Sequence, residues 1–323
     1  MLLGAVAAAG LAATALAAPR HLPGGADGGS PAGDERATSA ALESRTSHLD
    51  AVDPGYRSTA GWPRHGQGAY VLNDARPAAS PHQEPVAIAS VAKVMTAYLV
   101  LQHHPLGAGE DGPEFEVGED DVADTETRRH EGQSTVAVRA GERLTEREAL
   151  MAILLPSANN VAVLVARQVS GSVPAFVAEM NRTARRLGMS QTTYTDPSGL
   201  DDGTVSTALD QLRLAQVVAR DETLAAMMAT SSYRLPVAGV VTNTNTLLGR
   251  DGFVGMKTGS DRAAGGCFMF RAVWHTDRGD VTLIGVVLGQ RGHSLINAGL
   301  SAARRLADGL AGGGPPRDVP LQP

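Results

Sequence analysis

The stretch Pro85-Val86-Ala87-Ile88-Ala89-Ser90-Val91-Ala92-Lys93-Val94-Met95-Thr96-Ala97-Tyr98-Leu99-Val100-Leu101 places one serine and one lysine in an otherwise apolar run. No glycine or proline interrupts Ser90 to Leu101, and this continuity favours a helix. The helix should end at His104, because a residue that precedes a proline is disfavoured in the α region. A helix that is apolar on nearly all its faces is typical of a core. The stretch therefore predicts a buried helix that carries two reactive side chains.

Ser90 and Lys93 are three residues apart, so a helix would place their Cβ atoms about 5–6 Å from each other on one face. A serine hydroxyl needs a neighbouring base to become a good nucleophile, and a desolvated lysine can act as that base. The alternative is a solvent-facing lysine beside a helix-capping serine. The apolar flanks favour the first interpretation, because lysine is almost never fully buried without a partner.

Two later triplets strengthen the catalytic interpretation. Ser157-Ala158-Asn159 follows a leucine pair and Pro156, which predicts a turn between two helices, and Lys257-Thr258-Gly259 ends an apolar, strand-like run. The order S-x-x-K, S-x-N and K-T-G is the active-site signature of serine enzymes that react with penicillin. Each motif alone is weak evidence, but the three motifs in this order are specific.

Composition excludes several other classes. The chain has 323 residues, a formal net charge of −6 and one cysteine, and it shows no basic block of the kind that binds nucleic acid. A single Cys267 excludes an intrachain disulfide and a multi-cysteine zinc site, and we expect it to be a small buried residue on a strand. The histidines show no metal-binding spacing. We therefore expect no metal and no cofactor.

The chain divides into four parts by composition. Residues 1–18 form a short apolar run with a small-residue cleavage site, which indicates an export signal or an N-terminal anchor, although no Lys or Arg precedes it. Residues 19–60 resemble a disordered linker, residues 61–310 a catalytic domain, and residues 311–323 a disordered tail. The expected location is extracytoplasmic.

Within the domain the expected order is strands, a helical middle, then strands and a final helix. We predict a first strand at 68–72 and another short strand before Ser90, and the acidic run 116–121 should be a solvated surface. The remaining expected helices are 149–155, 161–170, 174–188, 209–220 and 294–310, and the remaining expected strands are 233–236, 252–258, 266–275 and 281–288. This order predicts an α+β (α/β) fold: an antiparallel sheet flanked by helices, with a helical subdomain inserted. The site should lie between the two parts.

The three motifs resemble those of the D-alanyl-D-alanine carboxypeptidase family, the low-molecular-mass penicillin-binding proteins of serine peptidase family S11. Further similar strings are Asp196-Pro197-Ser198-Gly199-Leu200, Ser206-Thr207-Ala208 and Asn243-Thr244-Asn245-Thr246-Leu247-Leu248-Gly249. The likeness extends over residues 62–310 and implies a penicillin-binding protein/β-lactamase-like fold. Asp196 departs from the family, which usually has Asn at this position.

The resemblance also implies a mechanism. Ser90 would attack the carbonyl between two D-alanines of a peptidoglycan stem peptide, Lys93 would take its proton, and β-lactams would be covalent inhibitors. The other implied roles are proton relay for Ser157, amide binding for Asn159, carboxylate binding for Lys257 and Thr258, and an oxyanion hole from the N–H groups of Ser90 and Ser260, next to Gly259.

Three points stay open. Family members with an arginine after the last strand use it to bind the substrate carboxylate, and only Arg291 is available here, in an uncertain register. A serine β-lactamase shares all three motifs, but the E-x-x-x-N string that would activate a deacylating water does not follow Asn159. A non-catalytic protein of the same fold that only binds cell-wall peptide is the other alternative.

Overall fold

A computed structural model describes residues 61–73, 75–277 and 279–311. The predicted signal or anchor, the predicted linker and residues 312–323 of the predicted tail lie outside the described residues. The boundaries assigned to these parts therefore stay predictions.

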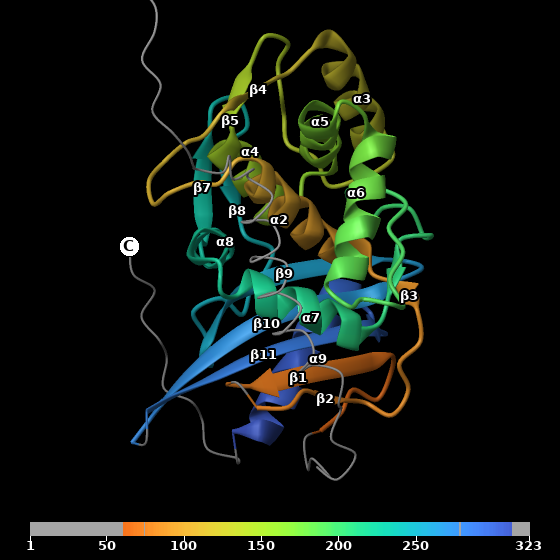
Figure 1. Ribbon diagram of the computed structural model, residues 1–323, viewed down its shortest axis with the longest axis vertical. Helices are drawn as coiled ribbons and strands as arrows, with labels where there is room; N and C mark the ends of the chain where they lie inside the picture. Colours follow the sequence, from red (N-terminus) through yellow and green to blue (C-terminus); the bar gives the residue numbers. More distant parts are fainter. Residues whose placement is uncertain (1–60, 74, 278, 312–323) are drawn as a thin grey trace, which may run out of the picture. The chain divides into compact units, whose positions relative to one another are not determined.

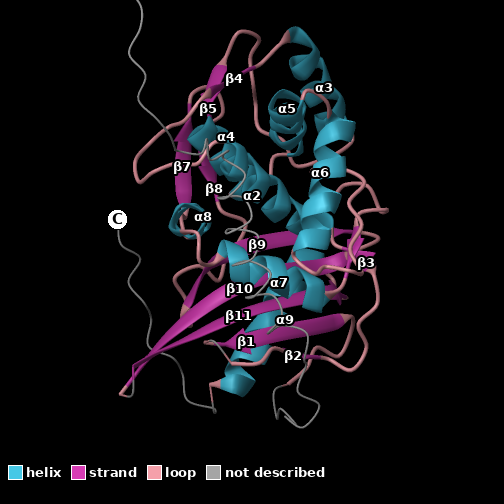
Figure 2. Cartoon of the chain, viewed as in Figure 1, coloured by secondary structure: helices cyan, strands magenta, loops and turns pink. Residues whose placement is uncertain are grey.

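The described chain is built around a five-stranded antiparallel sheet (Figures 1 and 2). The strand order is β2-β1-β11-β10-β9, so the first strands of the chain pair with the last ones. The strands are β1 (Gln67–Leu72), β2 (Ala78–Ala79), β9 (Phe253–Asp261), β10 (Gly265–Thr276) and β11 (Gly279–Gln290). Strand β9 therefore lies at one edge of the sheet.

The alternation of side chains along β10 separates two hydrophobic clusters. Phe268, Phe270 and Trp274 pack into the cluster that contains α9 (Leu295–Leu310), whereas Cys267 and Met269 pack into the larger cluster on the other face. This is the two-residue period expected of a strand that is covered on both faces. Cys267 is a buried residue of a strand, as predicted.

Helices cover the second face of the sheet. Helix α7 (Ala208–Val218) contacts β1 and β11, and α2 (Lys93–His103) contacts α4, α5, α6 and α7. Nearly all residues of α2 are buried, and the helix ends before His104, as predicted. Helix α2 therefore connects the sheet with the helical subdomain.

The helical subdomain lies on one side of the sheet (Figure 2). Its elements are α3 (Glu119–His130), α4 (Glu146–Leu154), α5 (Asn159–Ser170), α6 (Val173–Arg186), α8 (Glu222–Met228) and three short two-stranded sheets, β3-β6 (Val86–Ala87, Val205–Ser206), β4-β5 (Glu114–Glu116, Arg143–Thr145) and β7-β8 (Ser232–Leu235, Gly239–Thr242). Among the described helices, no single one is long and apolar enough to cross a membrane, and one bent pair, α5 with α6, meets the length and composition limits together.

The predicted α+β class and the antiparallel sheet with a helical subdomain are confirmed. One local prediction was wrong. Ser90 lies in a 3-10 turn, η2 (Ala89–Ala92), and the α-helix begins only at Lys93. In the acidic run 116–121, Glu116, Glu119 and Asp120 are exposed, as predicted. The run also includes the first turn of α3, where Asp121 is buried against Arg167 at 2.9 Å.

Candidate active site

The site begins with Ser90 and Lys93, whose side chains meet across the junction between η2 and α2. The Nζ atom of Lys93 lies 2.8 Å from Ser90 Oγ and donates a second hydrogen bond, also of 2.8 Å, to the carbonyl oxygen of Ser198. Lys93 is fully buried, whereas Ser90 is half-buried. A buried amine next to a hydroxyl is the arrangement that the sequence predicted for proton transfer.

The pKa of Lys93 lies well below its usual value. Burial is the main cause, because it disfavours the charged amine, and the positive charges of Lys257 and Arg128 act in the same direction. The carboxylate of Asp196 opposes them and raises the pKa. Lys93 can therefore exist as a neutral base at a pH far below that of an exposed lysine.

Asp196 fixes the loop that holds Lys93. Its carboxylate accepts hydrogen bonds from the N–H groups of Ser198, Gly199 and Leu200. It also accepts from the Ser198 hydroxyl at 2.6 Å and from Thr204 Oγ1 at 2.7 Å. The loop then offers its Ser198 carbonyl oxygen to Lys93. Asp196 therefore supplies both a loop scaffold and a negative charge near Lys93.

The backbone around Ser90 is closely packed against two glycines from other parts of the chain. Ala89 has a positive φ of 46°, an uncommon conformation for a residue with a side chain. A Cβ atom on Gly199 would lie 1.9 Å from the Ala89 carbonyl oxygen, and a Cβ atom on Gly259 would lie 2.9 Å from the backbone nitrogens of both Ser90 and Val91. Strand β9 can therefore approach the reactive turn because position 259 is a glycine.

Ser157 and Ala158 of the second motif lie on the turn before α5, as predicted, but the helix begins two residues earlier than expected and includes Asn159. Ser157 has a positive φ of 68°, and its buried Oγ atom has no hydrogen-bond partner among the described residues. Asn159 is the first residue of α5, its Nδ2 donates to Gln133 Oε1 at 3.1 Å, and its buried Oδ1 is likewise without a described partner. A buried polar atom without a partner is costly, so these two atoms are available for a ligand.

The third triplet lies on the edge strand β9. The Lys257 amine is buried and donates to the Thr258 carbonyl oxygen at 3.0 Å, and burial lowers its pKa to about 7. Thr258 Oγ1 lies 2.6 Å from Thr244 Oγ1, and the Thr244 N–H donates to the carbonyl oxygen of Leu155, two residues before Ser157. This chain of contacts links the second and third triplets. Ser260, at the end of β9, is exposed.

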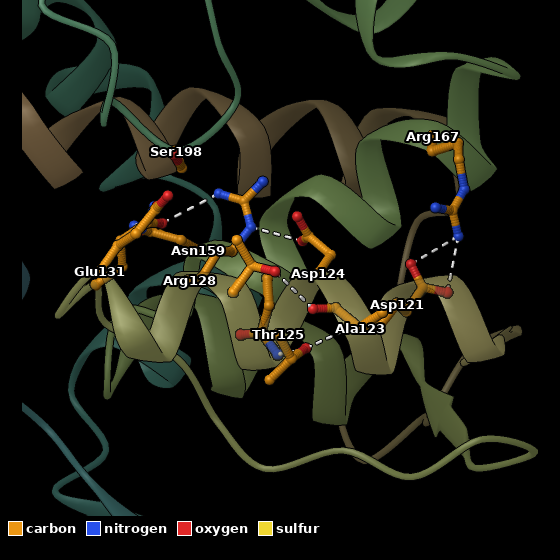
Figure 3. Close-up of polar contacts among 12 residues, drawn as sticks. Asp121, Ala123, Asp124, Thr125, Arg128, Glu131, Asn159, Arg167 and Ser198 are labelled. Atoms are coloured by element: carbon orange, nitrogen blue, oxygen red, sulfur yellow. Dashed lines mark hydrogen bonds and ion pairs between the residues drawn. The ribbon is translucent and has the colours of Figure 1, made fainter.

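Two residues near the site, Arg128 and Gln133, were missed by the sequence analysis, which selected no site residue between the acidic run 116–121 and Ser157. Arg128 of α3 donates to Asp124 at 2.6 Å (Figure 3). It also donates to Gln133 Oε1 at 3.1 Å, so Gln133 contacts both Arg128 and Asn159. Acids in the first turn and bases in the last turn of residues 119–130 are the signal for a helix here.

Arg291 contacts the turn that follows Ser260 at the end of β9. It donates to the carbonyl oxygens of Arg262 and Ala263, and it lines a cavity of about 670 Å³ together with Arg64 and Arg305, which belong to the start of the described chain and to α9. In the described part of the chain, no group of three or more His, Cys, Asp or Glu side chains is arranged to hold a metal ion. The buried Lys93 amine beside the Ser90 hydroxyl is suited to acid–base and nucleophilic chemistry.

Comparisons with known proteins agree with this geometry. A family model described as D-alanyl-D-alanine carboxypeptidase matches residues 75–292. A Bacillus subtilis protein named D-alanyl-D-alanine carboxypeptidase DacF is 30% identical over 212 residues, which are 64% of this chain and 52% of that protein. A Pseudomonas aeruginosa protein named D-alanyl-D-alanine endopeptidase is 33% identical over 207 residues, which are 62% and 63% of the two chains. The matched parts thus span between half and two thirds of these relatives.

Solved structures show the same fold. The Streptomyces K15 DD-transpeptidase aligns with a TM-score of 0.67 at 23% identity and covers 78% of this chain and 99% of its own. Penicillin binding protein 5 from Haemophilus influenzae aligns with a TM-score of 0.64 at 25% identity, over 76% and 71% of the two chains. The motif order, the fold and a family match over more than half its length together place this chain in the D-alanyl-D-alanine carboxypeptidase family.

Proposed function

We propose that this protein is a serine-type D-Ala-D-Ala carboxypeptidase that removes the terminal D-alanine from peptidoglycan stem peptides. The observation that carries the proposal is the 2.8 Å contact between Ser90 Oγ and the buried Lys93 amine, whose pKa is lowered. Family membership supports the same activity. The substrate lies outside the cytoplasm, and this is the location that we propose for the enzyme.

In the proposed reaction, neutral Lys93 takes the hydroxyl proton while Ser90 Oγ attacks the carbonyl carbon between the two D-alanines. The N–H groups of Ser90 and Ser260 would stabilise the negative oxygen that forms, a contribution of about 3 kcal/mol of barrier per donor in comparable enzymes. Ser157 would relay this proton from Lys93 to the leaving D-alanine nitrogen, so that Lys93 is neutral again and Ser157 keeps its hydroxyl. Water would then hydrolyse the ester on Ser90 and regenerate the hydroxyl.

The remaining residues would hold the substrate. Lys257 and Thr258 would bind the terminal carboxylate, and Asn159 would bind an amide of the peptide. The unpartnered Ser157 Oγ and Asn159 Oδ1 support these roles, because a bound peptide would supply the missing hydrogen bonds. Gly259 would let β9 approach Ser90 closely. No cofactor takes part in this mechanism, and β-lactams would be trapped as esters of Ser90.

The test uses a fluorescent penicillin and a peptide that ends in D-Ala-D-Ala, with wild-type protein and Ser90→Ala. The proposal expects covalent labelling and D-alanine release, both abolished in Ser90→Ala. Rapid turnover of the penicillin without D-alanine release would instead identify a β-lactamase. Labelling with no turnover of either compound would indicate a binding protein.

An endopeptidase is the second candidate, because one relative with 33% identity bears that name. Both reactions break a bond that follows a D-alanine, so the same site serves either. A cross-linked muropeptide dimer with no free D-Ala-D-Ala end separates them. Its cleavage at a higher kcat/KM than that of the pentapeptide would favour the endopeptidase over the carboxypeptidase.

A further inference from the structure

The amide of Gln133 lies between two side chains of opposite charge. Its Oε1 accepts from Arg128 Nη1 at 3.1 Å, and its Nε2 donates to Glu131 Oε2 at 2.7 Å. Arginine can only donate hydrogen bonds and an ionised carboxylate can only accept them. The two charges therefore allow one orientation of the Gln133 amide, with its oxygen toward Arg128.

The orientation of the Gln133 amide also determines that of the Asn159 amide. Asn159 Nδ2 lies 3.1 Å from the same Gln133 Oε1, and a rotated Asn159 would place two oxygens against each other. The Asn159 amide is thereby fixed with its nitrogen toward Gln133. Its buried Oδ1 then remains as an acceptor without a partner among the described residues.

The elements that carry this chain of contacts are themselves held in place. Arg128 is anchored by Asp124 at 2.6 Å, one turn earlier on α3. The Asn159 N–H donates to the carbonyl oxygen of Ser134, which follows Gln133. The hydrogen bond between Arg128 and Asp124 joins two charged groups, and such charge-assisted hydrogen bonds are stronger than neutral ones. A rotation of the Asn159 amide would therefore break its hydrogen bond to an oxygen that is itself held in place.

We propose that Arg128, Gln133 and Glu131 are positioning residues that set which end of the Asn159 amide faces the substrate. This inference rests on the proposed function for its kinetic consequence, because Asn159 is there the residue that binds the peptide amide. The three residues do not touch the reacting atoms. They determine substrate binding through Asn159 alone.

The first test is a double-mutant cycle of Gln133→Met with Asn159→Ala, measured as kcat/KM for D-alanine release. Loss of one hydrogen bond that orients a binding group should lower kcat/KM about tenfold in Gln133→Met, mainly through KM. In the Asn159→Ala background the same change should have no further effect. An equal loss in both backgrounds would overturn the proposal, because a general structural role does not depend on Asn159.

Two further variants distinguish a loss of positioning from a general folding defect. Gln133→Glu retains an oxygen for both Arg128 and Asn159 and should recover most of the activity, since Glu131 is exposed and can move away. Gln168→Met is the matched control, because Gln168 hydrogen-bonds only to the backbone of Glu116, where β4 ends. It should leave kcat/KM unchanged. Failure of Gln133→Glu to exceed Gln133→Met would contradict the proposal.

A third measurement needs no enzymatic activity. The side-chain amide signals of Asn159 in the ¹⁵N NMR spectrum of the substrate-free protein should shift and exchange faster in Gln133→Met but not in Gln133→Glu. Unchanged Asn159 signals in Gln133→Met would reject the positioning role. If the wild-type protein neither bound penicillin nor released D-alanine, the proposed function would be wrong. The NMR measurement would still show whether Gln133 orients the Asn159 amide.

Discussion

Gly259→Ala is the substitution that tests most directly how the sheet supports the reactive serine. The added Cβ atom would lie 2.9 Å from the backbone nitrogens of Ser90 and Val91 and 3.1 Å from the carbonyl oxygen of Ile88. Ordinary contacts begin at 3.4 Å, so the two backbones must separate by about 0.5 Å (3.4 − 2.9 = 0.5). All three opposing atoms belong to the main chain and cannot rotate away.

The expected result is a slower reaction in a folded protein. A misplacement of about 1 Å can cost roughly a hundredfold in rate, so half that distance should cost about tenfold. Overpacking should also lower the free energy of unfolding by about 1–3 kcal/mol. The assay is the second-order rate constant for acylation by a fluorescent penicillin, together with urea unfolding.

The control is Gly118→Ala, because a Cβ atom there would be 3.5 Å from its nearest neighbour, a side-chain oxygen of Asp121, which is an ordinary contact distance. Gly118→Ala should acylate at the wild-type rate. If Gly259→Ala kept the wild-type acylation rate and the wild-type free energy of unfolding, the close-packing argument would be refuted, because β9 and η2 would then accommodate a Cβ atom without moving apart.

Three other predictions follow from the charges and burial described above. Asp196→Asn removes the negative charge that raises the pKa of Lys93, so the acid limb of the acylation rate, which reports neutral Lys93, should move to lower pH; an unmoved limb would contradict this. Burial raises the pKa of Glu146 from 4.5 to about 7, so the folded state binds more protons between these values, and stability should fall by roughly 3 kcal/mol as pH rises from 4.5 to 7. Urea unfolding of Glu146→Gln at pH 5 and pH 8 should lose most of that difference. Burial raises the pKa of Cys267 to about 12, so thiol reagents should label it only after unfolding, and labelling of the native protein within minutes would contradict its burial.

Local signals in the sequence explain how much could be predicted. The capping box of Thr145 and Glu148 is present, although α4 begins at Glu146 rather than at Ala149 as predicted. Thr207 is the N-cap of α7, and apolar alternation located β10 and β11. These features depend on neighbours within a few residues, so pattern and spacing are sufficient to find them.

The 3-10 turn at Ser90 could not be predicted in the same way. It depends on Ala89 with positive φ and on the Asp196 loop, whose Gly199 packs against Ala89 from more than a hundred residues away. No local pattern encodes such a contact.

The role of α3 was missed for a different reason. Its composition is polar and charged, and only Asp121 and Thr125 of its residues are buried, so it lacks the apolar stripe that normally reveals a helix. Its connection to Asn159 runs through Gln133, which is a single polar residue in a loop. Sequence spacing alone gave no reason to select that glutamine.

The position of η2 beside β9 has a consequence for the solubility of the protein. An edge strand with unpaired N–H and C=O groups is a template for pairing with another molecule and so for aggregation. Here β9 pairs with β10 along one side, and η2 and α8 contact it. The turn that carries Ser90 therefore also packs against this edge strand, and substitutions that loosen the turn should expose more of β9 and promote aggregation.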